Sequence, residues 1–433
     1  MNFDLNTFFR KKILIYGLGK SGISAYEFLK KDNQIFLYDD FETKSKNLKL
    51  KKNLISYKKI LKSDFDYVII SPGIDLNKCK LSNFLKKNLN KIFSDLDIFY
   101  TFYKNSCITI TGTNGKSTTC KLLYEIFKDQ KFHVKLVGNI GNPILSTKNI
   151  KKKTIFIIEA SSYQLEYSKL FKSSYAAILN LAIDHIERHK SLNNYTKAKF
   201  KLLKNQNRKD YAFLKKSDPL IKKHLKLNKY KSKIIKVDTK NVDKTLHDIK
   251  NDYFLSDTNK ENLSFVLEIS KRFNLKKKIL IKTLQNFKGL KYRQEIILKR
   301  KNLLIINDSK STSLSSSESL LKKEMKIYWL IGGIFKKKDK LNLPRKYFKN
   351  IKAYIYGKNK NIFKKILNKK IKNENFSNLE IALKKILTLV KKNRNKNQMI
   401  LFSPSAASFD QFKNFEERGL YFNNLIKKNL SEI

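Results

Sequence analysis

The sequence predicts an α/β protein of three consecutive Rossmann-like domains, of which the central one has a parallel sheet of the phosphate-loop ATPase type. Short apolar runs typical of buried strands alternate with helical patterns along the 433 residues. Most of these runs end in a turn of small or polar residues. This alternation is typical of parallel sheets, whose ligands lie beyond the carboxyl ends of the strands. We place the domains at residues 1–93, 94–289 and 290–433.

Composition limits the class of protein. Apolar residues make up 41% of the chain, and no apolar run approaches the length of a membrane span. The first residues lack a signal-peptide pattern, and the three cysteines, Cys79, Cys107 and Cys120, fit a reducing compartment better than a disulfide framework. We therefore expect a cytoplasmic protein without membrane insertion.

The net charge of +56, from 93 Lys and Arg against 37 Asp and Glu, raises the question of nucleic-acid binding. The lysines are spread along the chain, however, and no cold-shock, helix-turn-helix or zinc-finger pattern accompanies them. We expect a solvated basic surface that attracts anionic substrates, and no nucleic-acid partner.

The first domain begins with a glycine-rich turn between a strand and a helix. The strand at 12–16 precedes Gly17-Leu-Gly-Lys-Ser-Gly22, a helix runs through 24–29, and a second strand at 35–38 ends at Asp39. Glycines that let a phosphate approach, followed by an acidic residue about 20 positions later, predict a nucleotide pocket without saying which nucleotide. A third strand at 67–70 runs into Ser71-Pro-Gly73 at the same sheet edge.

The central domain opens with Ile108-Thr-Ile-Thr-Gly-Thr-Asn-Gly-Lys-Ser117, followed by a helical segment at 120–127. Loop amides and the positive end of the helix dipole predict an anion site. Lys116 adds a charge for the outer phosphates, and the Ser117 hydroxyl is placed to ligate Mg²⁺. The full phosphate-loop pattern needs a glycine where Ile110 stands. A glycine turn with a solvated lysine is the alternative, and we favour nucleotide binding.

Two further strands carry polar residues to the same edge. The strand at 154–158 ends at Glu159, where phosphate-loop enzymes place a Mg²⁺-binding acid, and the strand at 177–181 leads to Asp184-His185. Between them, Gly138-Asn-Ile-Gly141 forms a turn able to expose backbone amides. A helix at 195–203 carries Lys199, which by composition alone is one lysine among many.

The rest of the sequence, from residue 205 onward, carries less specific patterns. Residues 205–257 are rich in lysine and weakly patterned, and predict short strands on the rim of the central domain. Helices at 259–273 and 276–287 precede a linker at 289–293. A third α/β unit then has strands at 303–307, 327–331, 351–356 and 399–403.

These motifs resemble, along the whole chain, the Mur ligase family and, within it, the branch that adds D-glutamate. The resemblance rests on these stretches: Thr111-Gly-Thr-Asn-Gly-Lys-Ser117, Gly138-Asn-Ile-Gly141, Glu159-Ala-Ser-Ser-Tyr-Gln-Leu-Glu166, Asp184-His185, Asn307-Asp-Ser-Lys310 and Ser403-Pro-Ser-Ala-Ala-Ser-Phe-Asp-Gln-Phe-Lys-Asn-Phe-Glu-Glu-Arg-Gly419. It implies an ATP-dependent amide ligase of peptidoglycan precursor synthesis, which joins D-glutamate to UDP-N-acetylmuramoyl-L-alanine through an acyl phosphate. We expect small-molecule substrates and a monomer.

The resemblance also implies the roles of residues around ATP and two Mg²⁺ ions. Lys116, His185 and Lys199 would be catalytic, Ser117 and Glu159 would hold the first Mg²⁺, and His185 and a carbamylated Lys199 would hold the second. Asn259 and Asn262 would lie near adenine, and Arg293 and Asp308 would contact ATP from the hinge and the third domain. The ATP-binding residues by resemblance are Gly112, Thr113, Asn114, Gly115, Lys116, Ser117, Thr118, Asn259, Asn262, Arg293 and Asp308.

The same resemblance assigns the two other substrates. The UDP-sugar would bind to Lys20, Ser21, Asp39, Ser71 and Gly73, with Asn139 at its sugar-peptide end. D-Glutamate would bind to Thr312, Lys336, Ser408 and Phe415 in a third domain that swings about 289–293 to close on ATP. After Gly332-Gly333 the family has an acidic residue and a glycine around a lysine, whereas this chain reads Ile-Phe-Lys-Lys-Lys338. Which of these lysines meets D-glutamate stays open.

Three alternatives remain at this point. The first is another ligase of the same family, one that extends folate with glutamate. The second is a nicotinamide-dependent oxidoreductase that uses Gly17 to Gly22, but this leaves the second glycine loop and Glu159 unexplained. The third is a basic binding protein without enzymatic activity.

Overall fold

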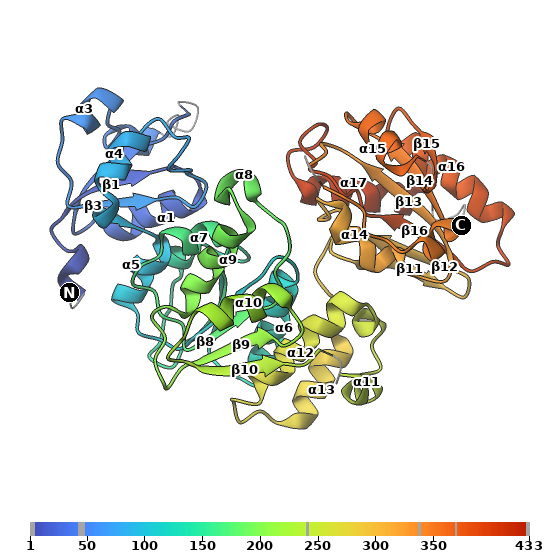
Figure 1. Ribbon diagram of the computed structural model, residues 1–433, viewed down its shortest axis with the longest axis horizontal. Coiled ribbons are helices and arrows are strands. Elements are labelled where there is room, and N and C mark those ends of the chain that lie inside the picture. The colour runs from blue at the N-terminus through green and yellow to red at the C-terminus, as the bar shows by residue number, and fades with distance from the viewer. Residues whose placement is uncertain (1–4, 42–47, 240–241, 337–338, 369, 430–433) are drawn as a thin grey trace. The chain divides into compact units, whose positions relative to one another are not determined.

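The computed structural model describes residues 5–41, 48–239, 242–336, 339–368 and 370–429. Three β-sheets follow one another along the chain, and helices pack on their faces (Figure 1). Strands in the order β2-β1-β3-β4 form the first sheet, β10-β9-β8-β5-β7-β6 the second and β11-β12-β16-β13-β14-β15 the third. The prediction of an α/β protein with three sheet-bearing domains is confirmed.

The first sheet is parallel throughout and lies where the sequence places it. Four of the five residues of β1 are buried, which fits a strand covered on both faces. The helix after the glycine turn begins at Lys20, earlier than the expected 24–29 segment. The elements of this part are η1 Leu5–Phe8, β1 Lys12–Tyr16, α1 Lys20–Leu29, β2 Gln34–Tyr38, α2 Leu48–Lys51, α3 Tyr57–Leu61, β3 Tyr67–Ile70, α4 Ser82–Lys87, η3 Leu89–Lys91, β4 Ile92–Phe93 and α5 Asp95–Phe102.

The second sheet is also parallel, and its central strand β5 is buried at all five positions. The expected strand at 177–181 is displaced: β8 ends at Ile178, and the chain leaves the sheet there. The elements are β5 Cys107–Thr111, α6 Lys116–Asp129, β6 Val134–Gly138, η4 Ile144–Ser146, β7 Ile155–Glu159, α7 Ser162–Tyr167, β8 Tyr175–Ile178, α8 Ile186–His189, α9 Leu192–Phe200, η5 Lys201–Leu203, β9 Tyr211–Lys215, α10 Pro219–Leu227, β10 Lys233–Val237, α11 Asp243–Ile249, η6 Asp252–Leu255, α12 Asp257–Ser270 and α13 Lys277–Asn286.

The lysine-rich stretch at 205–257 is only partly as expected. Strands β9 and β10 do form one edge of the central sheet, but helices α10 and α11 accompany them. Helix α10 buries only Ile221 and His224 of its nine residues, so its apolar stripe is too thin to stand out among the lysines.

The third sheet differs from the others by one antiparallel edge strand, β11, which pairs with β12. The other neighbours in this sheet are parallel. The sequence analysis did not predict β11, whose exposed and half-buried residues include charged side chains. The elements are β11 Glu295–Arg300, β12 Leu303–Asn307, α14 Leu314–Leu321, β13 Lys326–Gly332, η7 Arg345–Asn350, β14 Ile351–Tyr356, α15 Lys360–Leu367, β15 Lys372–Asn375, α16 Leu379–Lys392, β16 Gln398–Phe402 and α17 Phe415–Lys428.

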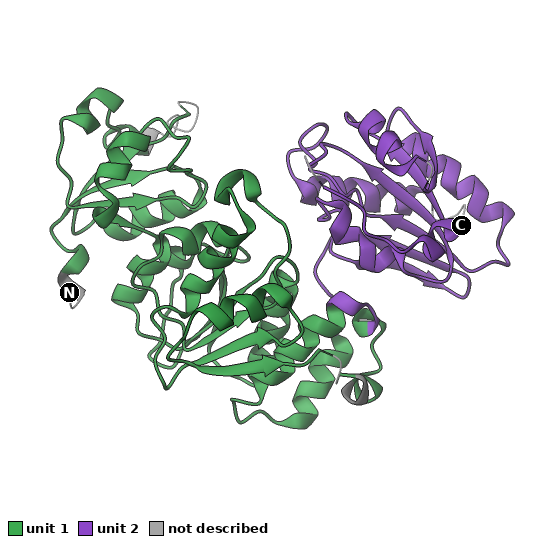
Figure 2. Ribbon diagram, viewed as in Figure 1, with its two compact units in different colours: residues 1–254, 259–286 green, residues 255–258, 287–433 purple. Residues whose placement is uncertain are grey.

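The chain separates into two compact units (Figure 2). Unit 1 comprises residues 1–254 and 259–286 and holds the first two sheets; unit 2 comprises 255–258 and 287–433 and holds the third. The first two sheets belong together because one cluster of buried apolar side chains, running from Phe8 to Ile221, includes residues of both. The domain limits at 93/94 and 289/290 stay predictions.

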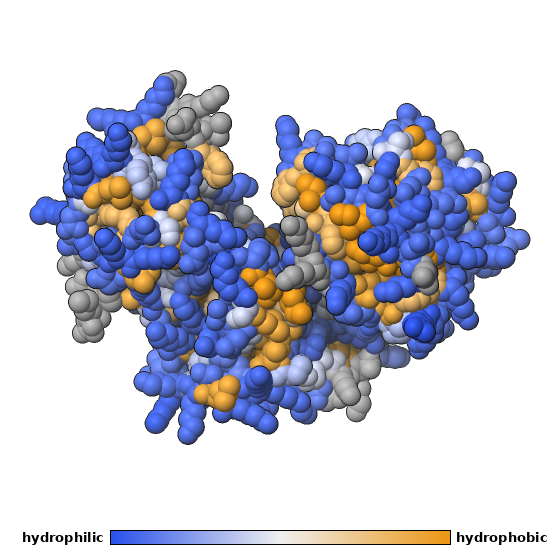
Figure 3. Space-filling view, turned by 45° about the horizontal axis from the view of Figure 1, so that its top comes forward, coloured by the Kyte–Doolittle hydropathy of each residue, from blue (hydrophilic) through white to orange (hydrophobic). Residues whose placement is uncertain are grey.

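Hydrophilic side chains cover most of the face shown in Figure 3, with smaller hydrophobic patches between them. Among the described residues, no helix combines the length and the apolar character needed to cross a membrane.

Candidate active site

The phosphate-binding loop lies between the buried strand β5 and helix α6. Gly115 precedes α6 with φ +85°, a left-handed conformation that favours glycine. A Cβ atom at this position would lie 2.0 Å from Oδ1 of Asn262 on α12. The loop and α12 therefore approach each other as closely as a glycine allows, and this brings one of the two expected adenine-side asparagines to the loop.

Two lysines converge on one carbonyl of this loop. Lys116 Nζ donates to the carbonyl oxygens of Gly112 (2.9 Å) and Thr113 (2.8 Å), and Lys199 Nζ donates to the same Gly112 oxygen (2.8 Å). Lys199 is 1% exposed, and its Nζ lies 4.7 Å from the centroid of the Tyr195 ring. Burial, followed by the charge of Lys116, holds the pKa of Lys199 well below its usual range.

A carboxylate and a hydroxyl meet beneath the loop. The Ser117 hydroxyl donates to Glu159 Oε2 (2.6 Å), and Asn139 Nδ2 donates to Glu159 Oε1 (3.0 Å). Glu159 ends β7 and is 1% exposed. Because Asn139 belongs to the turn after β6, Glu159 joins the phosphate-binding loop to the part of the site expected to hold the sugar-linked substrate.

His185 lies on the segment that follows β8. Its Nδ1 is 2.8 Å from the Tyr163 hydroxyl, and its Nε2 is 3.4 Å from Asp184 Oδ2. Burial raises the pKa of Tyr163 to about 12, so this phenol stays protonated at neutral pH. The Tyr163 ring also packs against Arg188, whose charge pairs with Glu166.

The donor set fits Mg²⁺. Within the described ranges, no three His, Cys, Asp or Glu side chains gather as a metal cage. Mg²⁺ is commonly held by one or two protein groups together with substrate phosphates and water, and oxygen donors such as those of Ser117 and Glu159 suit it. The site therefore has the ligands for a metal that arrives with a nucleotide.

Residues on α12 and after β8 complete the loop. Asn262 Nδ2 donates to Asn259 Oδ1 (3.4 Å), while Asn262 Oδ1 is buried and has no hydrogen-bond partner among the described residues. Asn180 was not predicted: its Oδ1 accepts from the Asn114 N–H (2.9 Å), and its Nδ2 donates to Glu261 Oε1 (2.6 Å). Asn180 is a polar residue that follows a strand end, the signal that singled out Glu159, so it could have been found.

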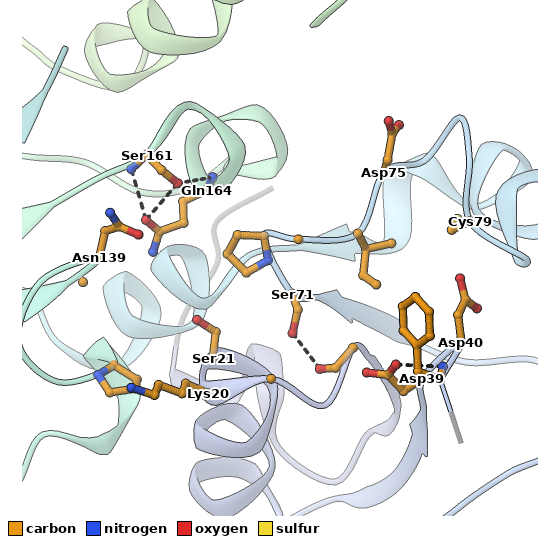
Figure 4. Close-up of a pocket in the computed structure, with 18 of the residues that line it drawn as sticks. Lys20, Ser21, Asp39, Asp40, Ser71, Asp75, Cys79, Asn139, Ser161 and Gln164 are labelled. Atoms are coloured by element: carbon orange, nitrogen blue, oxygen red, sulfur yellow. Dashed lines mark hydrogen bonds between the residues drawn. The ribbon is translucent and has the colours of Figure 1, made fainter. Parts of the chain in front are cut away.

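A pocket of about 550 Å³ lies between the first and second sheets, and all six residues expected to bind the UDP-sugar line it (Figure 4). Lys20 and Ser21 come from the start of α1, and Asn139 comes from the central domain. In Figure 4, Ser161 and Gln164 lie at the same side as Asn139, and Asp39 and Asp40 lie at the other side. The six expected residues are Lys20, Ser21, Asp39, Ser71, Gly73 and Asn139.

Backbone contacts hold the walls of this pocket. Asp39 Oδ2 accepts from the Leu18 N–H (2.7 Å), so the acid that follows β2 also fixes the glycine turn. Ser71 Oγ donates to the Gly17 carbonyl oxygen (2.6 Å). The sequence analysis did not single out Asp40 or Gln164. Asp40 accepts from the Tyr16 hydroxyl (2.7 Å), and Gln164 forms a capping box at the start of α7, within a motif that was noted.

Unit 2 holds the remaining predicted residues. Asp308 is 6% exposed and accepts from Ser403 Oγ (2.8 Å) and the Gln294 N–H (3.1 Å). Burial raises the pKa of Asp308 to about 7, against the opposite effects of these hydrogen bonds and of Arg293 and Arg418. An ionised Asp308 thus depends on the groups around it.

The four residues expected at D-glutamate belong to adjoining segments of unit 2. Ile334 pairs with Ala407, the residue before Ser408, and the Leu314 N–H donates to Asp339 Oδ2 (2.5 Å), which relates the segment of Thr312 to that of Lys336. The Phe415 ring lies 3.9 Å from Lys310 Nζ and 6.0 Å from the Arg293 guanidinium carbon. Of the three candidate lysines, Lys337 and Lys338 lie outside the described residues.

Known proteins resemble this chain at both domain and full-length level. Residues 110–280 match the Mur ligase middle domain, and residues 11–92 match the N-terminal domain of MurD-like Mur ligases. A UDP-N-acetylmuramoylalanine–D-glutamate ligase of Rickettsia prowazekii (strain Madrid E) is 34% identical over 98% of this chain and 99% of its own length. The enzyme of that name from Buchnera aphidicola subsp. Schizaphis graminum is 35% identical over 97% and 99%.

Solved structures show the same fold at lower identity. The UDP-N-acetylmuramate–alanine ligase MurC of Thermotoga maritima has a TM-score of 0.53 at 17% identity and covers 98% of this chain and 100% of its own. The MurF ligase of Thermotoga maritima in complex with ADP has a TM-score of 0.55 at 14% identity, over 85% of this chain and 91% of its own.

Proposed function

This chain belongs to the Mur ligase family, and we propose that it joins D-glutamate to UDP-N-acetylmuramoyl-L-alanine at the expense of ATP in peptidoglycan precursor synthesis. Relatives more than 30% identical over nearly the whole chain carry the name of that ligase. The structural observation that carries the proposal is the loop of Gly112 to Ser117, where Lys116, Lys199 and the Ser117–Glu159 pair surround one anion-binding turn.

The chemistry explains why such a loop is needed. A carboxylate is a poor electrophile, so the terminal carboxylate of the L-alanyl substrate first attacks the γ-phosphorus of ATP and releases ADP. The D-glutamate amine then attacks the acyl phosphate, forms the C–N bond and loses a proton, while phosphate leaves. Both steps bring anions together, so catalysis consists mainly of positioning and of charge stabilisation by fixed groups.

Each group of the loop has a part in the first step. Loop amides and the start of α6 bind the phosphates, and Lys116 turns from the loop carbonyls to the β- and γ-phosphates. Ser117 and Glu159 would hold one Mg²⁺, and His185 a second. Mg²⁺ supplies positive charge that offsets the charge developing on the transferred phosphoryl group. Asn259, Asn262, Arg293 and Asp308 would contact the nucleoside.

Lys199 would act as a carbamate. A buried lysine with a lowered pKa is more often the neutral amine, and a neutral amine adds to CO₂ and releases a proton. The product is an anion in place of a cation, beside the position proposed for the second Mg²⁺. The contacts of Lys199 with Gly112 and with the Tyr195 ring hold its amine where such a carbamate would face the loop.

The two other substrates would bind to different domains. The pocket of about 550 Å³ would take the UDP part, with phosphates at the start of α1 and Asn139 near the sugar-peptide end. Thr312, Lys336, Ser408 and Phe415 would hold D-glutamate. Unit 2 would rotate about residues 289–293 to close on ATP, and solution scattering with and without substrates would test that closure.

An ADP-release assay tests the proposal. Purified protein with Mg²⁺ and ATP should release ADP over many turnovers only when both UDP-N-acetylmuramoyl-L-alanine and D-glutamate are present. Release with a folate substrate and L-glutamate would favour the other ligase of the family. Oxidation of a nicotinamide cofactor would favour the oxidoreductase. Lys116→Ala should abolish release while circular dichroism stays that of the folded protein; full activity of this variant would contradict the proposed role of the loop.

A further inference from the structure

A chain of buried serine hydroxyls leads from Asp308 to the loop that carries Thr312. Ser403 Oγ donates to Asp308 Oδ2 (2.8 Å), and Ser317 Oγ lies 2.6 Å from Ser403 Oγ. Ser317 Oγ is also 2.9 Å from Ser311 Oγ and 2.6 Å from Ser405 Oγ. All four serines are at most 3% exposed. Ser317, on α14, is therefore the centre of a hydroxyl cluster enclosed by protein.

The directions of the hydrogen bonds among these serines depend on Asp308, which lies at one end of the series. Each hydroxyl has one hydrogen to donate and two lone pairs to accept with. Because the Ser403 hydrogen goes to Asp308, Ser403 accepts from Ser317, and Ser317 is then free to accept from Ser311 and Ser405. When Ser311 and Ser405 donate to Ser317, rather than to the Ser313 and Ser403 carbonyl oxygens nearby, each hydroxyl polarises the next in favour of the ionised form of Asp308.

The other end of this chain of serine hydroxyls contacts the loop that carries Thr312. Ser316 Oγ lies 2.7 Å from Ser311 Oγ and 2.5 Å from the Ser313 carbonyl oxygen, and its single hydrogen can be given to either of them. Thr312 lies between Ser311 and Ser313 and is exposed. A change in the charge of Asp308 would reverse the direction of the chain, because a protonated carboxyl can donate to Ser403. The hydrogen-bonding state of the Thr312 loop is thus tied to that of Asp308.

We propose that Ser317 is a positioning residue that keeps Asp308 ionised and, through Ser311, holds the Thr312 loop in place for the amino-acid substrate. The proposal rests on the assigned roles of Asp308 at ATP and Thr312 at D-glutamate. Its physical basis is that Ser317 contacts both Ser403, which donates to Asp308, and Ser311, the residue before Thr312.

The groups around Asp308 offset only part of the rise in its pKa that burial causes. Burial in apolar surroundings raises its pKa to about 7, and the groups that oppose the rise are the Ser403 hydroxyl, the Gln294 N–H, Arg293 before β11 and Arg418 on α17. Arg418 gives its Nε and Nη2 hydrogen bonds to Ser309 and Ala406 and not to Asp308. The hydrogen bond from Ser403, which ends the chain of serine hydroxyls, is the largest of the effects that oppose the rise.

The test compares Ser317→Ala, Ser317→Thr and Ser319→Ala in the full-length protein. Ser319 lies on the same helix, and its buried hydroxyl has no hydrogen-bond partner in the described part of the chain, so its loss controls for removing a serine from α14. Ser317→Ala should move the acidic limb of the pH profile of kcat/KM for ATP upward by about half to one pH unit. It should also raise KM for D-glutamate about 3- to 10-fold. Ser317→Thr should restore both values, and Ser319→Ala should change neither.

A readout without turnover separates this proposal from the proposed function. Nuclear magnetic resonance of protein labelled with ¹³C at the aspartate carboxyls follows Asp308 directly, and its signal is assigned by its loss in Asp308→Asn. In the Ser317→Ala protein the Asp308 carboxyl should titrate at a higher pH than in the parent protein. An unchanged Asp308 titration in a folded Ser317→Ala protein overturns the proposal, whether or not the chain is a ligase. A lower melting temperature with unchanged titration and unchanged KM would show that Ser317 only packs. Should Ser317→Ala not fold, Ser311→Ala and Ser403→Ala give the same comparison from either side of it.

Discussion

Replacement of Gly115 by alanine should impair ATP binding without unfolding the protein. Gly115 stands at φ +85°, and a Cβ built there lies 2.0 Å from Asn262 Oδ1. The new methyl group therefore meets both an unfavourable backbone conformation and the side chain of α12. The overlap is relieved by displacement of the Asn262 side chain and by movement of the loop away from α12, and the latter changes the direction of the amides at the start of α6.

The size of the effect follows from these two contributions. A left-handed conformation costs a residue with a Cβ about 1–2 kcal/mol relative to glycine. Displacing Asn262 weakens its hydrogen bond to Asn259, worth about 1 kcal/mol. Together they amount to about 2–3 kcal/mol, which must be supplied when the loop returns to its binding conformation. ATP should thus bind roughly 30- to 150-fold more weakly.

Isothermal titration with ATP and Mg²⁺ measures this change, and circular dichroism verifies the fold. Gly19→Ala is a matched control, because Gly19 also directly precedes a helix but has φ −74° and open space around its Cβ position. The control should bind ATP as the parent protein does. If Gly115→Ala bound ATP with unchanged affinity, the close approach of the loop to α12 would have no part in nucleotide binding.

Three further predictions concern buried charges. Asp97 accepts from the Ser94 N–H and from three successive N–H groups of 169–171. Asp97→Ala should therefore lower the free energy of unfolding, measured in urea, by about 3–5 kcal/mol. The control Asp64→Asn, at the surface, should leave the urea midpoint unchanged. An equal effect of the two changes would show that the buried carboxylate does not hold the segment. Burial raises the pKa of Asp95 to about 6 from 3.8, so the folded protein keeps this proton to higher pH than the unfolded chain does. The stability from this group is complete below pH 4 and falls by about 3 kcal/mol by pH 6, and Asp95→Asn should remove that fall; a persisting fall would assign it to another group. Lys199→Ala should lose ligase activity that added short carboxylic acids partly restore, since their carboxylate replaces the carbamate; no restoration at any concentration would count against the carbamate.

The backbone of the site could be predicted because glycine turns and strand ends leave a direct mark on the sequence. Gly17 to Gly22 and Gly112 to Ser117 each follow a buried apolar run, and both lead into a helix, which begins at Lys20 and at Lys116, before the expected segments 24–29 and 120–127. The six residues that the family resemblance assigns to the UDP-sugar all line one pocket: five follow strands of the first sheet, and Asn139 follows β6 of the second. Around these turns, the starts of α1 and α6 and the position of β8 differ from the expectation by a few residues.

The buried polar contacts could not be predicted, because nothing in a residue's neighbours along the chain reveals them. Lys199 is one of many lysines, yet α9 brings its amine to a carbonyl 87 positions earlier in the sequence. Ser317 is one of several serines in 311–319, and only the fold joins it to Ser403. Helix α10 was missed because two buried positions among lysines do not form a recognisable stripe.

The meeting of Lys116 and Lys199 at one oxygen has a consequence for the chemistry. Two ammonium groups within 3 Å of the same atom repel each other, and burial strengthens the repulsion because the surroundings screen it poorly. Burial is the main cause of the lowered pKa of Lys199, and the charge of Lys116 lowers it further. A neutral Lys199 ends the repulsion, and a carbamate turns it into attraction between Lys199 and both Lys116 and a metal ion. A triphosphate bound at the loop would offset the charge of Lys116 and so lessen its repulsion of a protonated Lys199.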